Sequence, residues 1–203
     1  MMMASARQRP RVEGDREDEI LEATIDLLVG VGYDRLTMDA VAREAKASKA
    51  TLYRRWESKA ALVIDALVKA KDMPNPEVPS TGSLRSDLIE TFCGHTGIAN
   101  TRAAEVMGAV LTATHTDPDF ATMFREKFIG PKIAVTQAIY LAAVERGEVS
   151  PEVDLEIIGP ALAAIVLHRS YLLGEAPTSE LVTRVIDHVI LPAATYGAPA
   201  QTR

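Results

Sequence analysis

The residues best suited to chemistry in this sequence are the cations and hydroxyls of residues 47–62, ASKATLYRRWESKAAL. The stretch holds four Lys or Arg side chains, a Tyr and the chain's only Trp, but a single carboxylate. Cations and hydroxyls together bind phosphate groups through charge-assisted hydrogen bonds. Because the whole chain has a net charge of −6, this local positive charge favours a polyanion-binding end on an acidic body. A solvated helix face with chance clustering is the alternative.

The division of charge along the chain supports the first interpretation. Residues 1–71 have a net charge of +1, whereas residues 72–203 have a net charge of −7. The N-terminal segment adds three arginines in RQRPR, residues 7–11. Such an arm can enter a minor groove of DNA, although terminal segments are more often disordered.

Metal and catalytic sites are not indicated. The four histidines lie at positions 95, 115, 168 and 188, and the sequence has no cluster of His, Cys, Asp and Glu at ligand spacing, such as two histidines at i and i+4. The sequence contains no G-x-S-x-G nucleophile motif and no Gly-rich phosphate loop. We therefore expect no catalytic residue, no metal and no cofactor.

Composition predicts a folded cytoplasmic protein. The 203 residues are 47% hydrophobic and 25% charged, which is ordinary for a folded domain. Cys93 is the only cysteine, so an internal disulfide framework is excluded. The longest apolar run, 157–167, is too short to span a bilayer, and no apolar signal segment follows the basic start. We expect no membrane partner.

Four helices are expected to position the basic stretch. The apolar periodicity of each predicts one buried face, and Thr37, Ser48 and Ser58 occupy N-cap positions. Gly32 is the expected C-terminal stop of the first helix. The expected helices are 15–31, 38–45, 49–56 and 59–71. The second and third, joined by a tight turn, form a helix-turn-helix whose third helix carries the cations.

The remainder of the chain also has helical patterning, so the predicted fold class is all-α. The Pro-rich segment 72–83 cannot continue a helix and is expected to be a linker. Ser83 and the pair Asp117–Pro118 fit helix starts, and Gly147 fits a helix end. The expected helices are 84–97, 101–115, 118–128, 131–146, 154–173 and 178–195.

The last two helices predict a homodimer. The helix 154–173 is apolar nearly all round, and the helix 178–195 has a broad apolar stripe. A partner that presents the same two helices would bury them in a four-helix interface. The alternative is that they form the core of their own domain. The expected interface residues are Ile165, Leu172, Leu181, Val182, Val185, Ile186 and Val189.

Residues 37–63, TMDAVAREAKASKATLYRRWESKAALV, with the preceding GVGYDRLT, closely resemble the DNA-binding signature of the TetR (tetracycline-repressor-like) family. The resemblance covers about 50 residues. It implies an N-terminal three-helix helix-turn-helix DNA-binding domain and a C-terminal helical domain for ligand binding and dimerisation. The implied division is a flexible basic arm 1–14, a DNA-binding domain 15–58 and a ligand-binding and dimerisation domain 59–203.

The same resemblance assigns roles to individual residues. Thr37 and Ser48 match helix caps, Tyr53 and Lys59 match phosphate-backbone contacts, and Leu52 and Trp56 match inward-facing positions. The residues implied to contact DNA are Thr37, Lys46, Ser48, Lys49, Ala50, Thr51, Tyr53, Arg54 and Lys59.

The turn departs from the family pattern. The usual Ala-Gly-Val-Ser is here Ala45-Lys46-Ala47-Ser48. Lys46 must therefore take the turn conformation with a side chain, and we expect a positive φ at a cost of about 1 kcal/mol. Its ammonium group can offset the cost through a phosphate contact. Ala50, where glycine is common, can touch a thymine methyl.

Large or soft side chains spread over the middle helices predict a ligand pocket, because family members bind a small molecule there. A plain hydrophobic core is the alternative. His95 and His168 are the expected polar anchors, since an apolar pocket needs few. The expected pocket residues are Phe92, His95, Met107, Phe120, Met123, Phe124, Phe128, Tyr140, His168 and Tyr171.

Together these patterns predict a homodimeric regulator that binds a palindromic double-stranded DNA operator, usually as a repressor. A small apolar or amphipathic effector would release it by favouring a state whose recognition helices no longer match successive major grooves. One alternative is a helical enzyme or small-molecule carrier that uses the C-terminal cavity. Another is an adaptor that keeps the motif but does not bind DNA.

Overall fold

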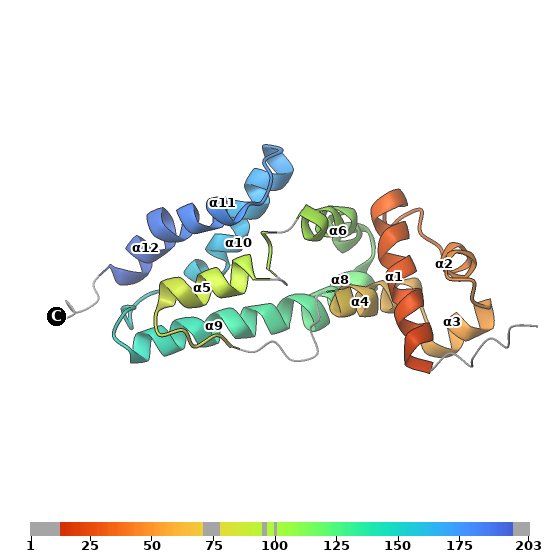
Figure 1. The fold of residues 1–203 in the computed structure, drawn as a ribbon, viewed down its shortest axis with the longest axis horizontal. Helices are drawn as coiled ribbons and strands as arrows, with labels where there is room; N and C mark the ends of the chain where they lie inside the picture. The colour runs from red at the N-terminus through yellow and green to blue at the C-terminus, as the bar shows by residue number, and fades with distance from the viewer. Residues whose placement is uncertain (1–12, 71–77, 95–96, 100, 197–203) are drawn as a thin grey trace, which may run out of the picture.

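The computed structural model describes residues 13–70, 78–94, 97–99 and 101–196, and these residues form an elongated bundle of helices without a strand (Figure 1). Helices α1, α2 and α3 form one end of the molecule, and the described chain finishes at the other end. The predicted all-α fold is confirmed.

The N-terminal helices begin and end close to the expected residues. They are α1 (Glu13–Val31), α2 (Met38–Glu44), α3 (Lys49–Arg55) and α4 (Lys59–Ala70). The Thr37 hydroxyl accepts a hydrogen bond from the Ala40 amide, and the Ser48 hydroxyl accepts one from the Thr51 amide. These N-cap bonds satisfy amides that the first turn of a helix leaves unpaired, so the predicted caps of α2 and α3 are confirmed.

The remaining helices form the longer part of the molecule. They are α5 (Leu84–Cys93), α6 (Thr101–Leu111), α7 (Ala113–Thr116), α8 (Pro118–Phe124), η1 (Arg125–Ile129), α9 (Gly130–Glu145), α10 (Leu155–Leu172), α11 (Ser179–Val185), η2 (Ile186–Ile190) and α12 (Leu191–Thr195). The helix α4 packs on α1 and α8, and it therefore connects the two parts (Figure 1).

At two places a helix passes a proline by means of a π-helical turn instead of stopping before it. The expected break between 128 and 131 is absent, because η1 is a π-helical turn in which the Gly130 amide bonds to the Arg125 carbonyl five residues back. Proline has no amide hydrogen and its ring crowds the carbonyl four residues earlier. The wider π turn makes room for Pro131. The segment η2 does the same before Pro192, with Leu191 bonded to Ile186.

The buried side chains form two hydrophobic cores. The first contains side chains of α1, α2, α3 and α4 together with Phe120, Phe124 and Phe128. The second contains side chains of α5, α9, α10 and α11. The continuous helix 118–145 contributes to both cores. Leu52 and Trp56 are 0% and 2% exposed, so their predicted inward orientation is confirmed.

Candidate DNA interface and ligand cavity

The turn between α2 and α3 has a defined, strained geometry. Lys46 has a φ of 52°, which confirms the predicted positive φ at this position. The Lys46 amide donates to the Arg43 carbonyl at 3.1 Å, and the Ala47 amide donates to the Ala42 carbonyl at 2.8 Å. These two bonds are those of a Schellman C-cap. Arg16 of α1 donates to the Lys46 carbonyl, so α1 also supports the turn.

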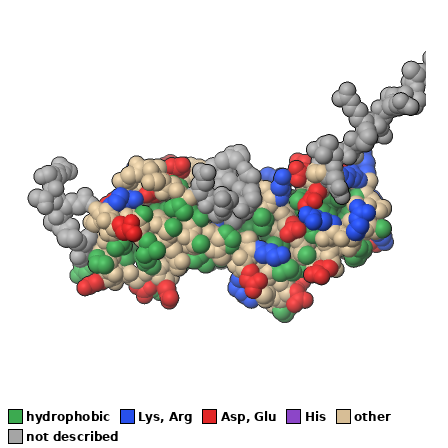
Figure 2. Space-filling model, turned by 90° about the horizontal axis from the view of Figure 1, so that it is seen from below, with side chains coloured by type: hydrophobic (Ala, Val, Ile, Leu, Met, Phe, Trp, Pro, Cys, Tyr) green, Lys and Arg blue, Asp and Glu red, His purple; other side chains and the backbone are tan. Residues whose placement is uncertain are grey.

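The helix α3 presents its polar side to solvent. Leu52 and Trp56 anchor its other side, which leaves Tyr53 55% exposed at the end of the molecule where Lys and Arg side chains gather (Figures 1 and 2). The structure therefore brings most of the predicted DNA-contacting residues onto one surface. The exposed members are Thr37, Lys46, Ser48, Lys49, Ala50, Tyr53 and Arg54, while Thr51 is half-buried.

Carboxylates of neighbouring helices pair with two cations of this surface. Lys49 Nζ lies 2.6 Å from Asp39 of α2, and Arg55 Nη2 lies 2.9 Å from Glu17 of α1. An exposed ion pair contributes only about 0–1 kcal/mol, so a phosphate group can displace it. Sequence reasoning missed these two acidic partners, because only packing brings them to α3.

Lys59 has an internal role in this structure. Its ammonium group donates to the Tyr33 carbonyl at 3.0 Å and lies 4.0 Å from the centroid of the Tyr33 ring. The resemblance implied a phosphate contact for Lys59. The structure places it half-buried, where it joins the start of α4 to the loop after α1.

Tyr33 also connects the end of the molecule formed by α1, α2 and α3 to α8. Its hydroxyl donates to Asp117 Oδ2 at 2.7 Å, and Asp117 Oδ1 accepts the Phe120 amide at 3.0 Å as the N-cap of α8. Burial makes the largest contribution to raising the pKa of Tyr33, and the hydrogen bond to Asp117 makes the second largest. The hydrogen bond from the Phe120 amide makes the largest contribution to lowering the pKa of Asp117, and the bond from Tyr33 makes the second largest.

A row of aromatic rings continues from Tyr33 into the longer part of the molecule. The ring centroids are 4.6 Å apart for Tyr33 and Phe120, 5.6 Å for Phe120 and Phe124, and 5.2 Å for Phe124 and Phe128. Phe120, Phe124 and Phe128 are four residues apart, so they stack along one side of the helix. We call these four residues the aromatic row.

The aromatic row ends at a cavity of about 310 Å³ between the two cores. Side chains of α1, α4, α6, η1, α9 and α10 line it, and its size suits a small organic molecule. Three of the predicted pocket residues, Met107, Phe128 and Tyr171, line this cavity. Tyr171 donates to the Ala104 carbonyl at 2.6 Å and so joins α10 to α6.

The other predicted pocket residues that the structure describes do not line this cavity. Phe120, Met123 and Phe124 pack in the first core, and Phe92 and Tyr140 belong to the second. Helical periodicity cannot distinguish a core face from a cavity wall, because both are apolar. His168 is exposed on α10. His95 lies outside the described residues, as does the basic arm.

Polar residues that sequence reasoning missed also line the cavity. They are Arg102, Lys132 and Ser170. Arg102 pairs with Asp26 of α1, whereas Lys132 lies over the Phe128 ring with its ammonium group 4.7 Å from the centroid. Burial lowers the pKa of Lys132. Lys132 follows Phe128 by four residues, so the sequence places the two side chains on the same side of a helix. The spacing does not reveal whether that side of the helix faces a void.

The predicted dimer residues divide into two groups. Leu181, Val182, Val185 and Ile186 are buried in the second core of the protomer, as the alternative interpretation had it. Ile165 is half-buried, and Leu172 and Val189 are exposed. The difference arises because α11 and η2 face α5 and α10 of the same chain.

The helix α10 nevertheless leaves a broad apolar side uncovered. Ile157 and Leu172 are 70% and 73% exposed, and its buried residues are Ile158, Leu162 and Val166. By length and composition alone this helix could also cross a membrane, but it packs against α9 and α11. Among the described residues, no group of three His, Cys, Asp or Glu side chains is placed to hold a metal ion.

These features define a helix-turn-helix protein with a separate internal cavity. Residues 20–66 match the family model of bacterial regulatory proteins of the tetR family, and residues 78–189 match the tetracyclin repressor-like C-terminal domain. The chain belongs to the TetR family, and it is a DNA-binding transcriptional regulator.

Relatives of known sequence agree with this assignment. An uncharacterized HTH-type transcriptional regulator of Mycobacterium tuberculosis is 39% identical over 89% of this chain and 88% of its own length. The DNA-binding transcriptional repressor TetR of Mycobacteroides abscessus is 33% identical over 90% of this chain and 96% of its own.

Solved structures agree as well. The TetR family transcription regulator SCO0332 superposes with a TM-score of 0.61 and 31% identity, covering 86% of this chain and 98% of that one. Salmonella enterica GusR superposes with a TM-score of 0.68 over 94% of this chain and 96% of its own, and at 18% identity it supports the fold alone.

Proposed function

We propose that this regulator is a cytoplasmic homodimeric repressor, which binds a palindromic operator and leaves it when a small molecule occupies the cavity. The observation that carries the proposal is the aromatic row, which connects the cavity wall at Phe128 to Tyr33 at the DNA-binding end. The repressor name of the Mycobacteroides abscessus relative supports the direction of regulation.

The proposed DNA contacts follow from the exposed surface of α2 and α3. Ala50 and Thr51, at the leading end of α3, are assigned to base edges in the major groove. Contacts with the phosphate backbone of the DNA are assigned to the hydroxyls of Thr37, Ser48 and Tyr53 and to the cations Lys46, Lys49, Arg54 and Lys59. To reach a phosphate, Lys59 must leave the Tyr33 carbonyl.

We further propose that the chain divides into an arm 1–14, a DNA-binding domain 15–58 and a ligand-binding and dimerisation domain 59–203. The exposed apolar side of α10 is the proposed dimer contact, with Ile157 and Leu172 in direct contact and Val189 beside them. The four buried residues of α11 and η2 support this surface from beneath. Burying such a side against a second copy forms a closed two-fold interface.

Release from DNA is then a population shift. A ligand that fits the cavity better in one arrangement of η1 favours that arrangement. Phe128 and Phe124 carry the change to Phe120 and to the N-cap Asp117, which is bonded to Tyr33. A change in the separation of the two recognition helices, which must match grooves about 34 Å apart, weakens operator binding.

The proposal assigns no enzymatic activity to the cavity. Its described lining residues include no Asp, Glu, His or Cys. The lining side chains Lys132, Ser170 and Tyr171 are assigned to holding a ligand.

A direct test is to select DNA from a random pool with the purified protein and to measure its affinity for the selected site at several salt concentrations. The expected result is a palindromic site, bound with a Kd near 10⁻⁸ M or tighter, whose affinity falls steeply with salt. If no sequence is enriched, or if a metabolite is turned over without any DNA binding, the proposal is refuted.

A further inference from the structure

The charges of the cavity are all of one sign. Its described lining contains two cations, Arg102 and Lys132, and no carboxylate, although the chain as a whole has a net charge of −6. The other lining side chains are mainly apolar. The excess of positive charge is therefore local to the cavity.

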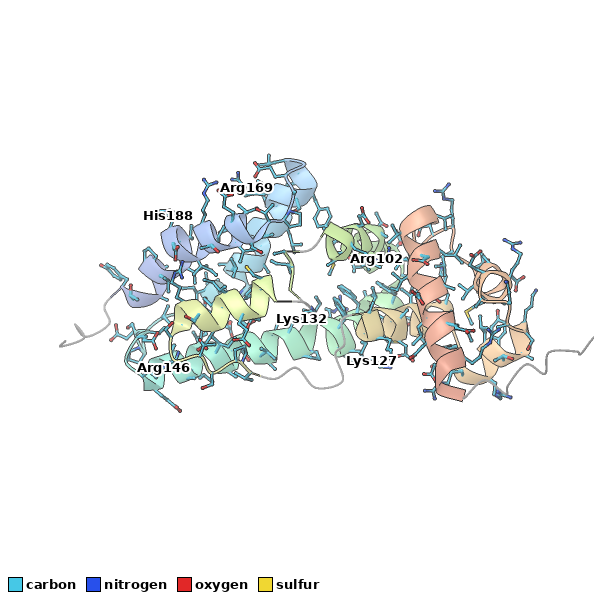
Figure 3. The ribbon with its side chains drawn as sticks, viewed as in Figure 1. Arg102, Lys127, Lys132, Arg146, Arg169 and His188 are labelled. Carbon is cyan, nitrogen blue, oxygen red and sulfur yellow. The ribbon has the colours of Figure 1, made fainter. Side chains whose placement is uncertain are left out.

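Only one of these cations already has a counter-ion in the described structure. Arg102 is exposed and pairs with Asp26 of α1. Lys132 forms no ion pair with any described carboxylate, and its contact is with the face of the Phe128 ring. Figure 3 places Lys132 near the middle of the molecule and Arg102 at α6, on the side where α6 faces α1.

A partly buried ammonium group without a carboxylate is costly, because burial removes its water without replacing the lost stabilisation. The lowered pKa of Lys132 is consistent with this desolvation. The aromatic face offsets a part of the cost. An anion in the cavity would offset more of it.

A second polar group opens onto the same cavity. The Ser170 hydroxyl of α10 is buried and forms no hydrogen bond with any described residue, and Ser170 lines the cavity. Buried polar atoms usually have partners, so this hydroxyl is available to a bound molecule. It can donate to an oxygen atom of that molecule or accept from one of its donors.

We propose that the cavity binds an amphiphile with a single anionic head group, which pairs with Lys132 while the apolar part of the molecule fills the remaining volume. That this molecule is the effector rests on the proposed function. The charge preference of the cavity does not depend on it.

A matched pair of fluorescent probes tests the charge preference in the full-length protein. The probe 1-anilinonaphthalene-8-sulfonate carries an anionic group, and N-phenyl-1-naphthylamine has the same rings without it. We expect Lys132→Met to weaken the binding of the sulfonate about tenfold or more, and to leave the neutral probe bound as tightly as before. Retained binding of the neutral probe shows that the cavity is intact.

Two further variants complete the design. Lys132→Arg keeps the charge and should keep the preference for the sulfonate. Lys127→Met removes an exposed lysine of η1 that does not line the cavity, and both probes should bind it as they bind the wild type. Equal ratios of the two affinities in the wild type and in Lys132→Met would overturn the proposal, as would a failure of the sulfonate to bind the wild type.

Operator binding, measured in parallel, separates this proposal from the proposed function. A compound that releases the operator and binds Lys132→Met as tightly as the wild type refutes the anion site but leaves the regulator. Lys132-dependent binding of the sulfonate by a protein that selects no DNA site refutes the regulator but leaves the anion site.

Discussion

The hydroxyl of Tyr33 donates a 2.7 Å hydrogen bond to Asp117, a residue 84 positions later in the chain. This bond joins the loop after α1 to the first turn of α8, the helix that leads through η1 to the cavity wall. Tyr33 is 3% exposed and Asp117 is half-buried, so the bond is partly shielded from water. The bond therefore ties the start of α8 to the loop that leads into α2.

Tyr33→Phe should lower the free energy of unfolding by about 1 kcal/mol, because it removes one buried hydrogen bond and keeps the ring. Tyr196→Phe is the matched control, since Tyr196 is 87% exposed, and it should change stability by less than about 0.5 kcal/mol. Urea unfolding at a fixed protein concentration measures both variants. Equal effects of the two substitutions would contradict the role of the bond.

The Asp117 carboxylate should make stability depend on pH. Because its folded pKa is lowered, its stabilising contribution is present above the unfolded pKa of about 3.9 and is lost as the pH falls through the folded pKa. The wild type should therefore exceed Asp117→Asn in stability at neutral pH, and the difference should shrink below about pH 4. Urea unfolding at a series of pH values measures it. Asp119→Asn, at an exposed neighbour, should show no such change.

Lys46→Gly should separate strain from DNA contact. With a φ of 52° at this position, glycine removes a cost of about 1 kcal/mol, so the variant should be more stable than the wild type. Operator binding should weaken, with a salt dependence reduced by about one phosphate contact. Lys46→Ala is the control, because it should weaken operator binding equally without the gain in stability. A variant Lys46→Gly that binds the operator normally would exclude the phosphate contact.

The residues of α3 should divide into two groups in DNA binding. Arg54→Ala and Tyr53→Phe should weaken binding to many sequences, and Arg54→Ala should reduce the salt slope by about 0.9. Thr51→Ala should instead change which bases are preferred. Affinity measured across a panel of operator variants distinguishes these results, with Arg184→Ala of α11 as the control. The assigned roles would be refuted if the three variants changed the affinities for the panel of operators in the same way.

Leu172→Asp should dissociate the dimer, because Leu172 is 73% exposed on the apolar side of α10 and a charge there opposes burial. Leu141→Asp is the control, since Leu141 of α9 is also exposed. Sedimentation should show a monomer only for the first variant. Val185→Asp and Ile186→Asp should unfold the protomer instead, as both side chains are buried in its own core. A monomeric wild type would refute the interface.

The local features of the DNA-binding end could be predicted from the sequence. Caps at Thr37 and Ser48 and the positive φ of Lys46 depend on chemistry within a few residues, and the structure agrees with each. The resemblance to one family located the whole motif. By contrast, the ion pair of Lys49 with Asp39 and the bond of Tyr33 to Asp117 depend on packing between helices.

The cavity and the proposed dimer surface could be predicted only in outline. An apolar side of a helix can face a core, a void or solvent, and Phe124, Phe128 and Leu172 illustrate the three situations. The choice depends on how neighbouring helices fill space, which periodicity does not encode. The π turn was missed because Gly130–Pro131 normally marks a helix boundary.

The π turn has a consequence for the tolerance of the chain to insertions and deletions. Each residue of an α-helix advances the direction of the following side chains by about 100°, and no flexible loop interrupts residues 118–145 to absorb a change in length. Deleting one residue between Arg125 and Ile129 would leave the local sequence of both cores intact and turn one against the other by roughly a quarter of a revolution. The number of residues in this segment thus sets the rotation of helices α1 to α4 relative to the second core.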